Sequence, residues 1–416
     1  MTTNTPAGRR APERPRTPEL PRAPERPRAP ERPAVDVAAL LADGWRPAPL
    51  RQFVLKVRSR CNLACDYCVI YEHGDHTWRR QPHAMGPAVL ARTAERIAEH
   101  AARHGLGRVR IVLHGGEPLL AGPGGVAGIV RTVREAAAEA GAEAEFTVQT
   151  NGTLLTPRML DALAEHRVRV GVSVDGDRAA HDAHRRTRAG RGSYDRVQAG
   201  LHLLAGSYPQ LYAGLLCTVD VERDPVAVYE SLLATRPPLI DFLLPHGHWG
   251  APPSGPPGAH GRWLAAVFDR WAGAPGKETS VRILDELLHT VLGGRSRLDW
   301  VGVTGTVSVF VEADGSLHQN DTLRTGADGA SASGLDVFRN SFDEVLLHPG
   351  FAARQAGERA LAEECLGCPE LAVCGGGEYG HRYRPGAGYR WPTVYCADLL
   401  LLIGHIRRWL ARAAER

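Results

Sequence analysis

Apolar residues follow two alternating patterns between about residues 50 and 250. Short runs rich in Val, Leu and Ile, typical of buried strands, alternate with segments whose apolar positions recur every three or four residues, as on one helix face. Two such faces are Leu90, Ala94, Ile97 and Ala101, and Val126, Ile129, Val130 and Val133. The expected strands are 52–58, 108–113, 145–149, 168–174, 212–219 and 239–244. Six strand–helix units in succession predict an α/β fold, a parallel sheet with helices on its outside.

The first 35 residues have no such periodicity. The sequence Arg-Ala-Pro-Glu-Arg-Pro is repeated at 10–15, 22–27 and 28–33. Because a proline at every second or third position with alternating charge cannot bury a core, we expect 1–35 to be a disordered, extended tail. We expect the rest of the chain to form two domains, at 48–295 and 296–416.

The composition narrows the class of protein. The chain has 416 residues and a formal net charge of +4, which is spread out and forms no stripe suited to nucleic acid. No apolar run is long enough to span a membrane, and the N-terminus lacks the apolar core of a signal peptide. Eight cysteines, most of them clustered, are typical of metal ligands in a reducing compartment rather than of disulfides. We therefore expect a cytoplasmic protein that binds neither nucleic acid nor membrane.

A short loop after the first expected strand carries three cysteines, Cys61, Cys65 and Cys68. Thiolates favour iron–sulfur clusters or zinc over hard cations. Three ligands leave one metal position open, so one iron of a four-iron cluster could bind a group that is not protein. The alternative is a zinc knuckle completed by His73 or His76, which the segments after the loop disfavour.

This loop resembles the cluster loop of radical S-adenosylmethionine (SAM) enzymes, which have the same spacing and an aromatic residue, here Tyr67, before the last cysteine. The resemblance implies a partial (β/α)6 barrel with its chemistry at the carboxyl ends of the strands. It also implies a [4Fe–4S] cluster whose open iron chelates the amino and carboxyl groups of SAM, with Tyr67 among the cofactor-binding residues. One electron, from a flavodoxin- or ferredoxin-type reductant, then cleaves SAM to a 5′-deoxyadenosyl radical.

Segments after further strands match the same family in order. A Gly-Gly-Glu-Pro segment follows the second expected strand, and the resemblance assigns its Glu117 to the amino group of SAM. Asn151, Ser173 and Asp175, at later strand ends, are expected to meet the SAM ribose and carboxylate. Arg185 is expected to grip the SAM carboxylate, a task that suits a planar guanidinium. From the residues alone, the double glycine could be a plain tight turn and Arg185 a solvated arginine at a helix start.

A second set of cysteines lies near the C-terminus: Cys365, Cys368, Cys374 and Cys396. Four thiolates complete a closed site, and their spacing alone suits a structural zinc about as well as a fully ligated [4Fe–4S] cluster. The set resembles the SPASM or shortened twitch domain of radical SAM enzymes that act on peptides, which implies an auxiliary [4Fe–4S] cluster. Because Asn320 stands where a ligand of a second auxiliary cluster would be, we expect only one.

Asp321 is the residue that we expect to act as general base. In the resembled enzymes a carboxylate at this place takes the proton lost when a substrate radical is oxidised. The alternative is an aspartate that shapes a β-turn together with Asn320. Outside the clusters, we expect Cys217 to be a core residue, and His246 and His248 to be ordinary surface histidines.

Three segments carry a finer resemblance, to cyclophane-forming peptide maturases of the FxsB type: 68–78, 374–383 and 392–398. The implied function is a carbon–carbon cross-link between an aromatic ring and a β-carbon in a ribosomally made precursor peptide, which would be the partner. A thioether-forming or sulfatase-type radical SAM maturase is the alternative within the family. A non-catalytic iron–sulfur or zinc protein is the alternative from another class, and an open cluster site beside an amino-acid-binding turn disfavours it.

Overall fold

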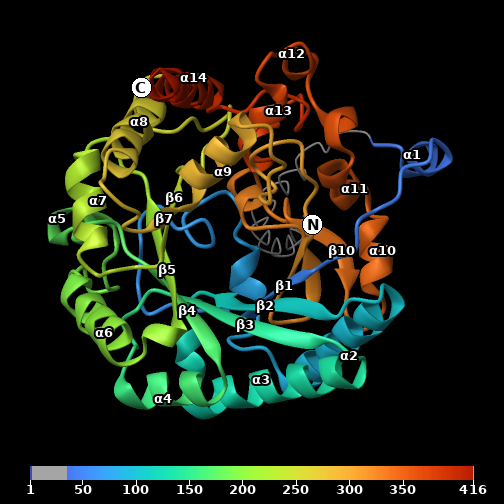
Figure 1. Ribbon diagram of the computed structural model, residues 1–416. Coiled ribbons are helices and arrows are strands. Elements are labelled where there is room, and N and C mark those ends of the chain that lie inside the picture. Colours follow the sequence, from blue (N-terminus) through green and yellow to red (C-terminus); the bar gives the residue numbers. More distant parts are fainter. Residues whose placement is uncertain (2–34, 416) are drawn as a thin grey trace.

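The computed structural model describes Met1 and residues 35–415 (Figure 1). All but the two end residues of the tail expected at 1–35 lie outside this part, so that expectation stays a prediction. No helix within the described part is both long and apolar enough to cross a bilayer.

One curved sheet organises the described chain (Figure 1), and its strands lie in the order β10-β9-β8-β1-β2-β3-β4-β5-β6-β7. The six central strands are parallel: β1 (Gln52–Arg58), β2 (Arg108–Gly115), β3 (Glu143–Thr150), β4 (Val168–Ser173), β5 (Tyr212–Thr218) and β6 (Leu239–Leu243). Each begins and ends within two residues of an expected strand. The parallel α/β sheet inferred from the sequence is therefore confirmed.

Four further strands extend the sheet beyond those that the pattern predicted. Two of them are parallel to their neighbours: β7 (Ser280–Val281), beside β6, and β8 (Ser308–Val311), beside β1. β9 (Ser316–His318) and β10 (Ala332–Asp336) continue from β8 as antiparallel neighbours. At two to five residues, these strands are too short to show the alternation on which a strand prediction depends.

Helices lie outside the curved sheet (Figure 1). Along the barrel these are α2 (Pro87–Arg103), α3 (Gly122–Glu139), α4 (Pro157–Glu165), α5 (Arg178–His184), α6 (Tyr194–Ser207), α7 (Pro225–Leu233), α8 (Ala259–Ala272) and α9 (Arg282–Val291). The others are α1 (Val37–Ala42), α10 (Phe342–Leu346), α11 (Pro349–Gln355), α12 (Glu363–Leu366), α13 (Leu371–Cys374) and α14 (Cys396–Ala414). The predicted helix faces lie in the core, where Ile97, Val126 and Val130 are fully buried.

The parallel register brings the candidate functional segments to one edge of the sheet. Lys56 of β1 pairs with His114 of β2, and Thr150 of β3 pairs with Val172 of β4. The loops that follow these strands therefore start at similar levels, at the carboxyl ends where barrels of this kind carry their chemistry. The C-terminal segments reach the barrel because α14, which begins at Cys396, packs against α8 and α9.

Candidate active site

The three-cysteine loop that follows β1 is anchored on the chain after α5. Leu63 is buried and forms a bridge with Thr187, and the backbone N–H of Ala64 donates to the carbonyl of Arg186 at 2.7 Å. The three thiols, of Cys61, Cys65 and Cys68, are free and half-buried. The loop is thus held by its backbone, and its thiols remain available as ligands.

The double glycine after β2 is required by close packing against this loop. A Cβ at Gly115 would lie 2.0 Å from the carbonyl oxygen of Arg58, and one at Gly116 would lie 2.4 Å from the carbonyl carbon of Arg60. The Gly116 N–H donates to Arg58 O at 2.7 Å. The glycines therefore serve to lay the Gly-Gly-Glu-Pro segment against the residues just before Cys61, which a plain tight turn would not need.

Glu117 is fully buried and its carboxylate is already engaged within the chain. It accepts hydrogen bonds from Leu119 N at 2.9 Å, Thr150 Oγ1 at 2.8 Å and Asn151 N at 2.8 Å. Burial raises the pKa of Glu117 to about 6, although these three donors oppose the rise. The carboxylate ties the loop after β2 to the end of β3. A carboxylate offers about four acceptor sites, so the expected contact with the SAM amino group stays a prediction.

Of the expected SAM-binding residues Asn151 and Ser173, at the ends of β3 and β4, Asn151 lies beside the cluster loop. Asn151 Nδ2 donates to Asn62 Oδ1 at 2.8 Å and lies 3.7 Å from Cys61 Sγ. Ser173 Oγ accepts a hydrogen bond from Gln149 Nε2 at 3.0 Å. Asn151 therefore joins the end of β3 to the thiol that opens the loop, and the contacts of both residues with SAM remain predictions.

Arg185 is buried, which contradicts the alternative of a solvated arginine. Its Nε donates to Asp175 Oδ2 at 2.8 Å and its Nη2 to Asp175 Oδ1 at 3.3 Å. Tyr67 donates its hydroxyl to the same carboxylate, and its ring lies 5.4 Å from the guanidinium carbon. Burial raises the pKa of Cys65 to about 12, and the charge of Arg185 opposes that rise. Three of the predicted cofactor-binding residues thus form one network beside Cys65.

Asp321 is held among cations. Lys56 donates to Asp321 Oδ2, Arg324 Nε donates to Oδ1 at 3.0 Å, and His114 Nδ1 lies 3.9 Å from Oδ2. Burial alone would raise the pKa of Asp321, but Lys56, Arg324 and His114 together hold it well below its usual range. Asp321 is also among the charges that influence the thiol of Cys68. The carboxylate is ionised and lies near the cluster loop.

The alternative interpretation of Asp321 as a turn residue stays open, because its carbonyl accepts a hydrogen bond from Arg324 N at 2.9 Å and so closes a turn. Asp321 precedes the 3₁₀ helix η4 (Thr322–Thr325), yet its side chain makes no capping hydrogen bond. Asn320 fills that role instead, because its Oδ1 accepts a hydrogen bond from Leu323 N at 3.4 Å. Its Nδ2 donates to Glu378 Oε1 at 3.1 Å. The role of Asp321 as a base stays a prediction, and its pairing with two cations lowers its basicity in this arrangement.

The C-terminal cysteines lie in or just after two short helices and at the start of the long last helix. Cys365 lies in α12, Cys374 ends α13, Cys396 begins α14, and Cys368 follows α12 with its N–H bonded to Cys365 O at 3.1 Å. Burial raises the pKa of Cys374 to about 11, and nearby Cys396 contributes to the rise. The four thiols are free and half-buried, as a ligand set requires.

The spacing of the sulfur atoms bears on the two metal classes left open by the sequence. In a tetrahedral site with Zn–S bonds of about 2.3 Å, neighbouring sulfurs lie about 3.8 Å apart. Over residues 35–415, no three cysteine Sγ atoms lie within 4.8 Å of one another. A cubane of four irons separates its ligands further than a single ion does. The described thiols therefore form no preset zinc site, and as free, half-buried thiols they are compatible with [4Fe–4S] ligation.

Two histidines expected at the surface lie inside the protein instead. The ring of His246, after β6, is 6.4 Å from that of His73 and 6.3 Å from that of His381. Its Nδ1 is buried and has no hydrogen-bond partner among the residues described, and burial lowers its pKa to about 4. His248 is also buried, and its Nδ1 accepts a hydrogen bond from Gly250 N at 3.0 Å. Both histidines shortly follow one of the six parallel strands, and this position in the sequence indicates side chains directed into the barrel. Cys217 is in the core, as expected.

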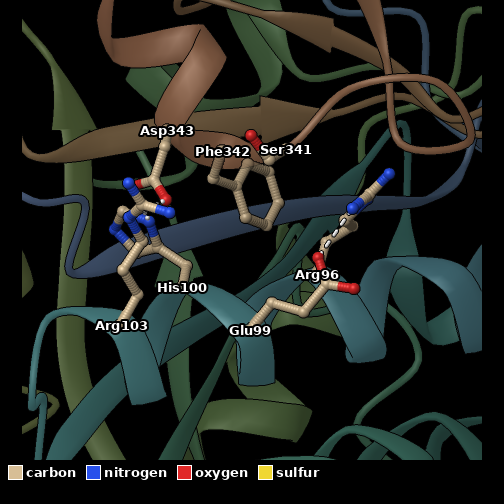
Figure 2. A pocket seen from close by; sticks show the side chains of 7 residues that line it. All are labelled: Arg96, Glu99, His100, Arg103, Ser341, Phe342 and Asp343. Carbon is tan, nitrogen blue, oxygen red and sulfur yellow. Dashed lines mark hydrogen bonds and ion pairs between the residues drawn. The ribbon is translucent and has the colours of Figure 1, made fainter.

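A further cluster resembles a metal site but lies at the other end of the barrel. His100, His104 and Asp343 lie close together, and His100 and Asp343 line a pocket of about 370 Å³ between α2 and α10 (Figure 2). The N–H of Leu50, just before β1, donates to His100 Nε2 at 3.0 Å. In the neutral ring, Nδ1 therefore carries the hydrogen, which it donates to Asp343 Oδ1 at 3.1 Å. His100 has no lone pair to offer an ion, so this cluster ties α2 to α10.

Comparisons with known proteins agree with the site. Residues 55–219 match the family model of the radical SAM superfamily. A cysteine-type anaerobic sulfatase-maturating enzyme of Clostridium perfringens is 24% identical over 344 residues, which are 79% of this chain and 88% of that protein. A serine-type anaerobic sulfatase-maturating enzyme of Bacteroides thetaiotaomicron is 26% identical over 264 residues, 59% of this chain and 63% of that protein. These relatives correspond to the sulfatase-type alternative rather than to a cyclophane-forming enzyme.

Solved structures show the same fold. Native anSMEcpe with bound AdoMet has a TM-score of 0.75 at 22% identity, and the match covers 88% of this chain and 99% of that one. SuiB of Streptococcus suis bound to precursor peptide SuiA has a TM-score of 0.59 at 14% identity, with 86% and 78% covered. The expected fold class is confirmed, and the family match confirms the expected cofactor class, SAM with a [4Fe–4S] cluster.

Proposed function

Since this chain belongs to the radical SAM superfamily, we propose that it is an enzyme that oxidises a side chain of a peptide or protein through a substrate radical. One observation carries the proposal. Asp321, a half-buried carboxylate from the C-terminal part of the chain, lies beside Lys56 and near the thiol of Cys68 in the cluster loop. A residue able to take a proton thus lies next to the place where a radical would form. The sulfatase-maturating relatives, which align with most of the chain, support the same class of reaction.

The residues present would hold the cofactors at two places. Cys61, Cys65 and Cys68 would bind the cluster with the open iron, and the C-terminal cysteines would bind the auxiliary one. When bound, the clusters and SAM supply the one-electron chemistry: a radical that removes a hydrogen atom from the substrate, and an acceptor for the electron left behind. Arg185, held by Asp175, would position the SAM carboxylate.

A residue of the chain itself would take up the proton that the reaction releases. Removal of a hydrogen atom and an electron from the substrate leaves one proton to be taken up. Asp321 is ionised and therefore has the form that accepts a proton, while Lys56 and Arg324 hold its two oxygens in place. We infer that substrate binding loosens the contact with Lys56, because an aspartate relieved of one cation becomes a stronger base.

A cyclophane-forming reaction is a second candidate, and one arrangement favours it. The three segments with the finer resemblance converge around His246. His73 comes from 68–78, His381 from 374–383 and Tyr395 from 392–398, and the rings of His381 and Tyr395 lie 4.9 Å apart. Tyr395 and His381 are buried, so the half-buried rings of His73 and His246 are the ones that suit contact with an aromatic residue of a precursor peptide.

Product analysis separates these candidates. The anaerobically reconstituted protein would be incubated with SAM, dithionite and three probes: a cysteine peptide, a serine peptide, and the candidate precursor encoded beside the gene. A sulfatase-type product carries an aldehyde that reacts with a hydrazide. A cyclophane product loses two hydrogens, does not react with hydrazide and resists fragmentation between the linked residues. Deoxyadenosine without any modified peptide, across all three probes, would contradict the assignment to peptide oxidation.

A further inference from the structure

Arg382 differs from the other buried arginines of the described chain. Four arginines are less than one-tenth exposed: Arg185, Arg324, Arg354 and Arg382. The first three each lie within 4.0 Å of a carboxylate oxygen, whereas Arg382, 8% exposed, has no such partner among residues 35–415. A buried charge without an opposite charge is costly. Beyond that distance, the groups whose negative charge favours the charged form of Arg382 are Tyr379, Glu378, Cys365 and Cys374.

A run of glycine carbonyls orients the guanidinium. Arg382 Nε donates to Gly376 O at 3.0 Å, and Nη2 donates to Gly375 O at 2.9 Å and Gly377 O at 2.6 Å. All three glycines have left-handed φ angles, of 64°, 81° and 70°. A Cβ at Gly376 would lie 3.2 Å from the guanidinium carbon. The Gly-Gly-Gly run after Cys374 is thus shaped around this cation.

The charge of Arg382 also affects the C-terminal thiols. The charge of Arg382 acts on Cys365 and Cys374, where it opposes the rise in pKa that burial causes. The carbonyls contribute only dipoles, and Glu378, a carboxylate whose charge also acts on Arg382, lies beyond the 4.0 Å of an ion pair. Deprotonated ligands around a cluster would add negative charge beside Arg382 to that of Glu378.

We propose that Arg382 is the internal counter-cation of the auxiliary cluster and raises its reduction potential. Reduction adds one negative charge to a cluster, and a fixed cation stabilises the reduced form more than the oxidised form. Arg382 is a positioning residue in this role, since it touches neither substrate nor SAM. The inference rests on the proposed function in one respect only, that the four C-terminal cysteines hold an iron–sulfur cluster.

The test measures a potential, which a merely structural role would not move. In a parent with Cys61, Cys65 and Cys68 changed to Ala, only the auxiliary cluster contributes. Redox titration monitored by electron paramagnetic resonance (EPR) would then compare Arg382→Gln, Arg382→Lys and Arg390→Gln in that full-length parent. Arg390 is the matched control, because it is exposed and its Nε also donates to a backbone carbonyl, that of Leu361, at 3.0 Å.

Arg382→Gln is expected to lower the reduced-to-oxidised ratio about tenfold at fixed potential, which is a shift of about 59 mV to more negative values. Arg390→Gln and Arg382→Lys should stay near the parent. An unchanged potential in an Arg382→Gln protein that retains its iron would overturn the proposal. If that variant loses iron, Arg382→Lys decides: parent-like iron and potential support a charge effect, and loss of either refutes it. Zinc in place of iron in the parent would instead refute the auxiliary cluster itself, and the proposal with it.

Discussion

The two cysteine sets differ in how the protein balances the buried charges around them. Beside the loop after β1, each buried cation meets a carboxylate, since Arg185 pairs with Asp175 and Lys56 pairs with Asp321. Beside the C-terminal set, Arg382 donates to glycine carbonyls, and no carboxylate oxygen of the described chain lies within 4.0 Å of it, although the charge of Glu378 acts on it.

This difference corresponds to an open and a closed site. A cluster with a vacant iron binds a charged cofactor. The charged side chains around it can therefore pair with one another before the cofactor binds. A cluster with four protein ligands receives nothing further, and a fixed cation of the protein is then the means of adjusting its charge. The comparison makes the two sites separable by experiment.

Removal of each ligand set should have the largest and most contrasting effects. Changing Cys61, Cys65 and Cys68 to Ala should lower the iron content from about eight to about four per chain and abolish SAM cleavage. Changing the four C-terminal cysteines to Ala should remove the other four irons while deoxyadenosine still forms. Iron analysis and chromatography of SAM products measure both. SAM cleavage that survives the first change would disprove the assignment of the open site.

Asp321→Asn should separate radical formation from product formation. The clusters and deoxyadenosine formation should remain, while modified peptide falls by about 10²–10⁴-fold, the usual effect of a positioned base. Mass spectrometry of the peptide after a fixed time measures this. A full yield of modified peptide would refute the role of Asp321 and leave the cluster assignments untouched.

Arg185→Ala should destabilise the open site. Loss of the guanidinium leaves Asp175 buried without its partner, for which we expect a fall of about 3–5 kcal/mol in the free energy of unfolding, together with weaker SAM binding. Urea denaturation and SAM titration measure the two effects. Arg178→Ala is the matched control, because Arg178 forms an exposed pair with Asp195 and should change neither quantity much. Equal effects of both substitutions would argue against a buried pair at Arg185.

Glu117 should make the free energy of unfolding depend on pH. Its pKa in the folded protein is raised to about 6 from 4.5, so between these values the folded state binds more protons than the unfolded state. Stability therefore falls as pH rises through this window, by about 2 kcal/mol from this group. The difference in unfolding free energy between wild type and Glu117→Gln, followed from pH 4 to 7, should show this slope. A flat difference would contradict a neutral, buried Glu117 at low pH.

Asp343→Asn should have the smallest effect, because Asp343 belongs to neither of the two cysteine sites. The cluster of His100, His104 and Asp343 ties two helices at the opposite end of the barrel, so we expect a loss of about 1 kcal/mol in stability. Iron content and SAM cleavage should not change, and zinc added to the wild type should not bind there. Tight zinc binding that this substitution abolishes would show that the tautomer argument is wrong.

The sequence predicted those parts of the fold that repeat a pattern. The six parallel strands were recoverable because each is a buried run followed by a helix with a regular apolar face. β8, β9 and β10 were not, because they are short and gain their place by pairing with β1 and with one another.

The site was predictable at the level of ligands and much less so at the level of contacts. The cysteine spacing identified both sets, whereas the pairing of Arg185 with Asp175 joins residues whose orientations depend on two separate loops. His246 was misjudged for the same reason: burial of a histidine after β6 depends on His381, which is 135 positions later in the chain. The partners of Asp321 come from β1, from the end of β2 and from η4, and no local pattern shows that they meet.

EPR spectroscopy of the reduced, reconstituted full-length protein, recorded with and without SAM, tests the central claim most directly. Two distinct [4Fe–4S]⁺ signals are expected, of which only one changes when SAM is added, and that signal should be absent once Cys61, Cys65 and Cys68 are changed to Ala. A single signal that is insensitive to SAM, with zinc bound by the C-terminal cysteines, would contradict an open and a closed cluster on this chain.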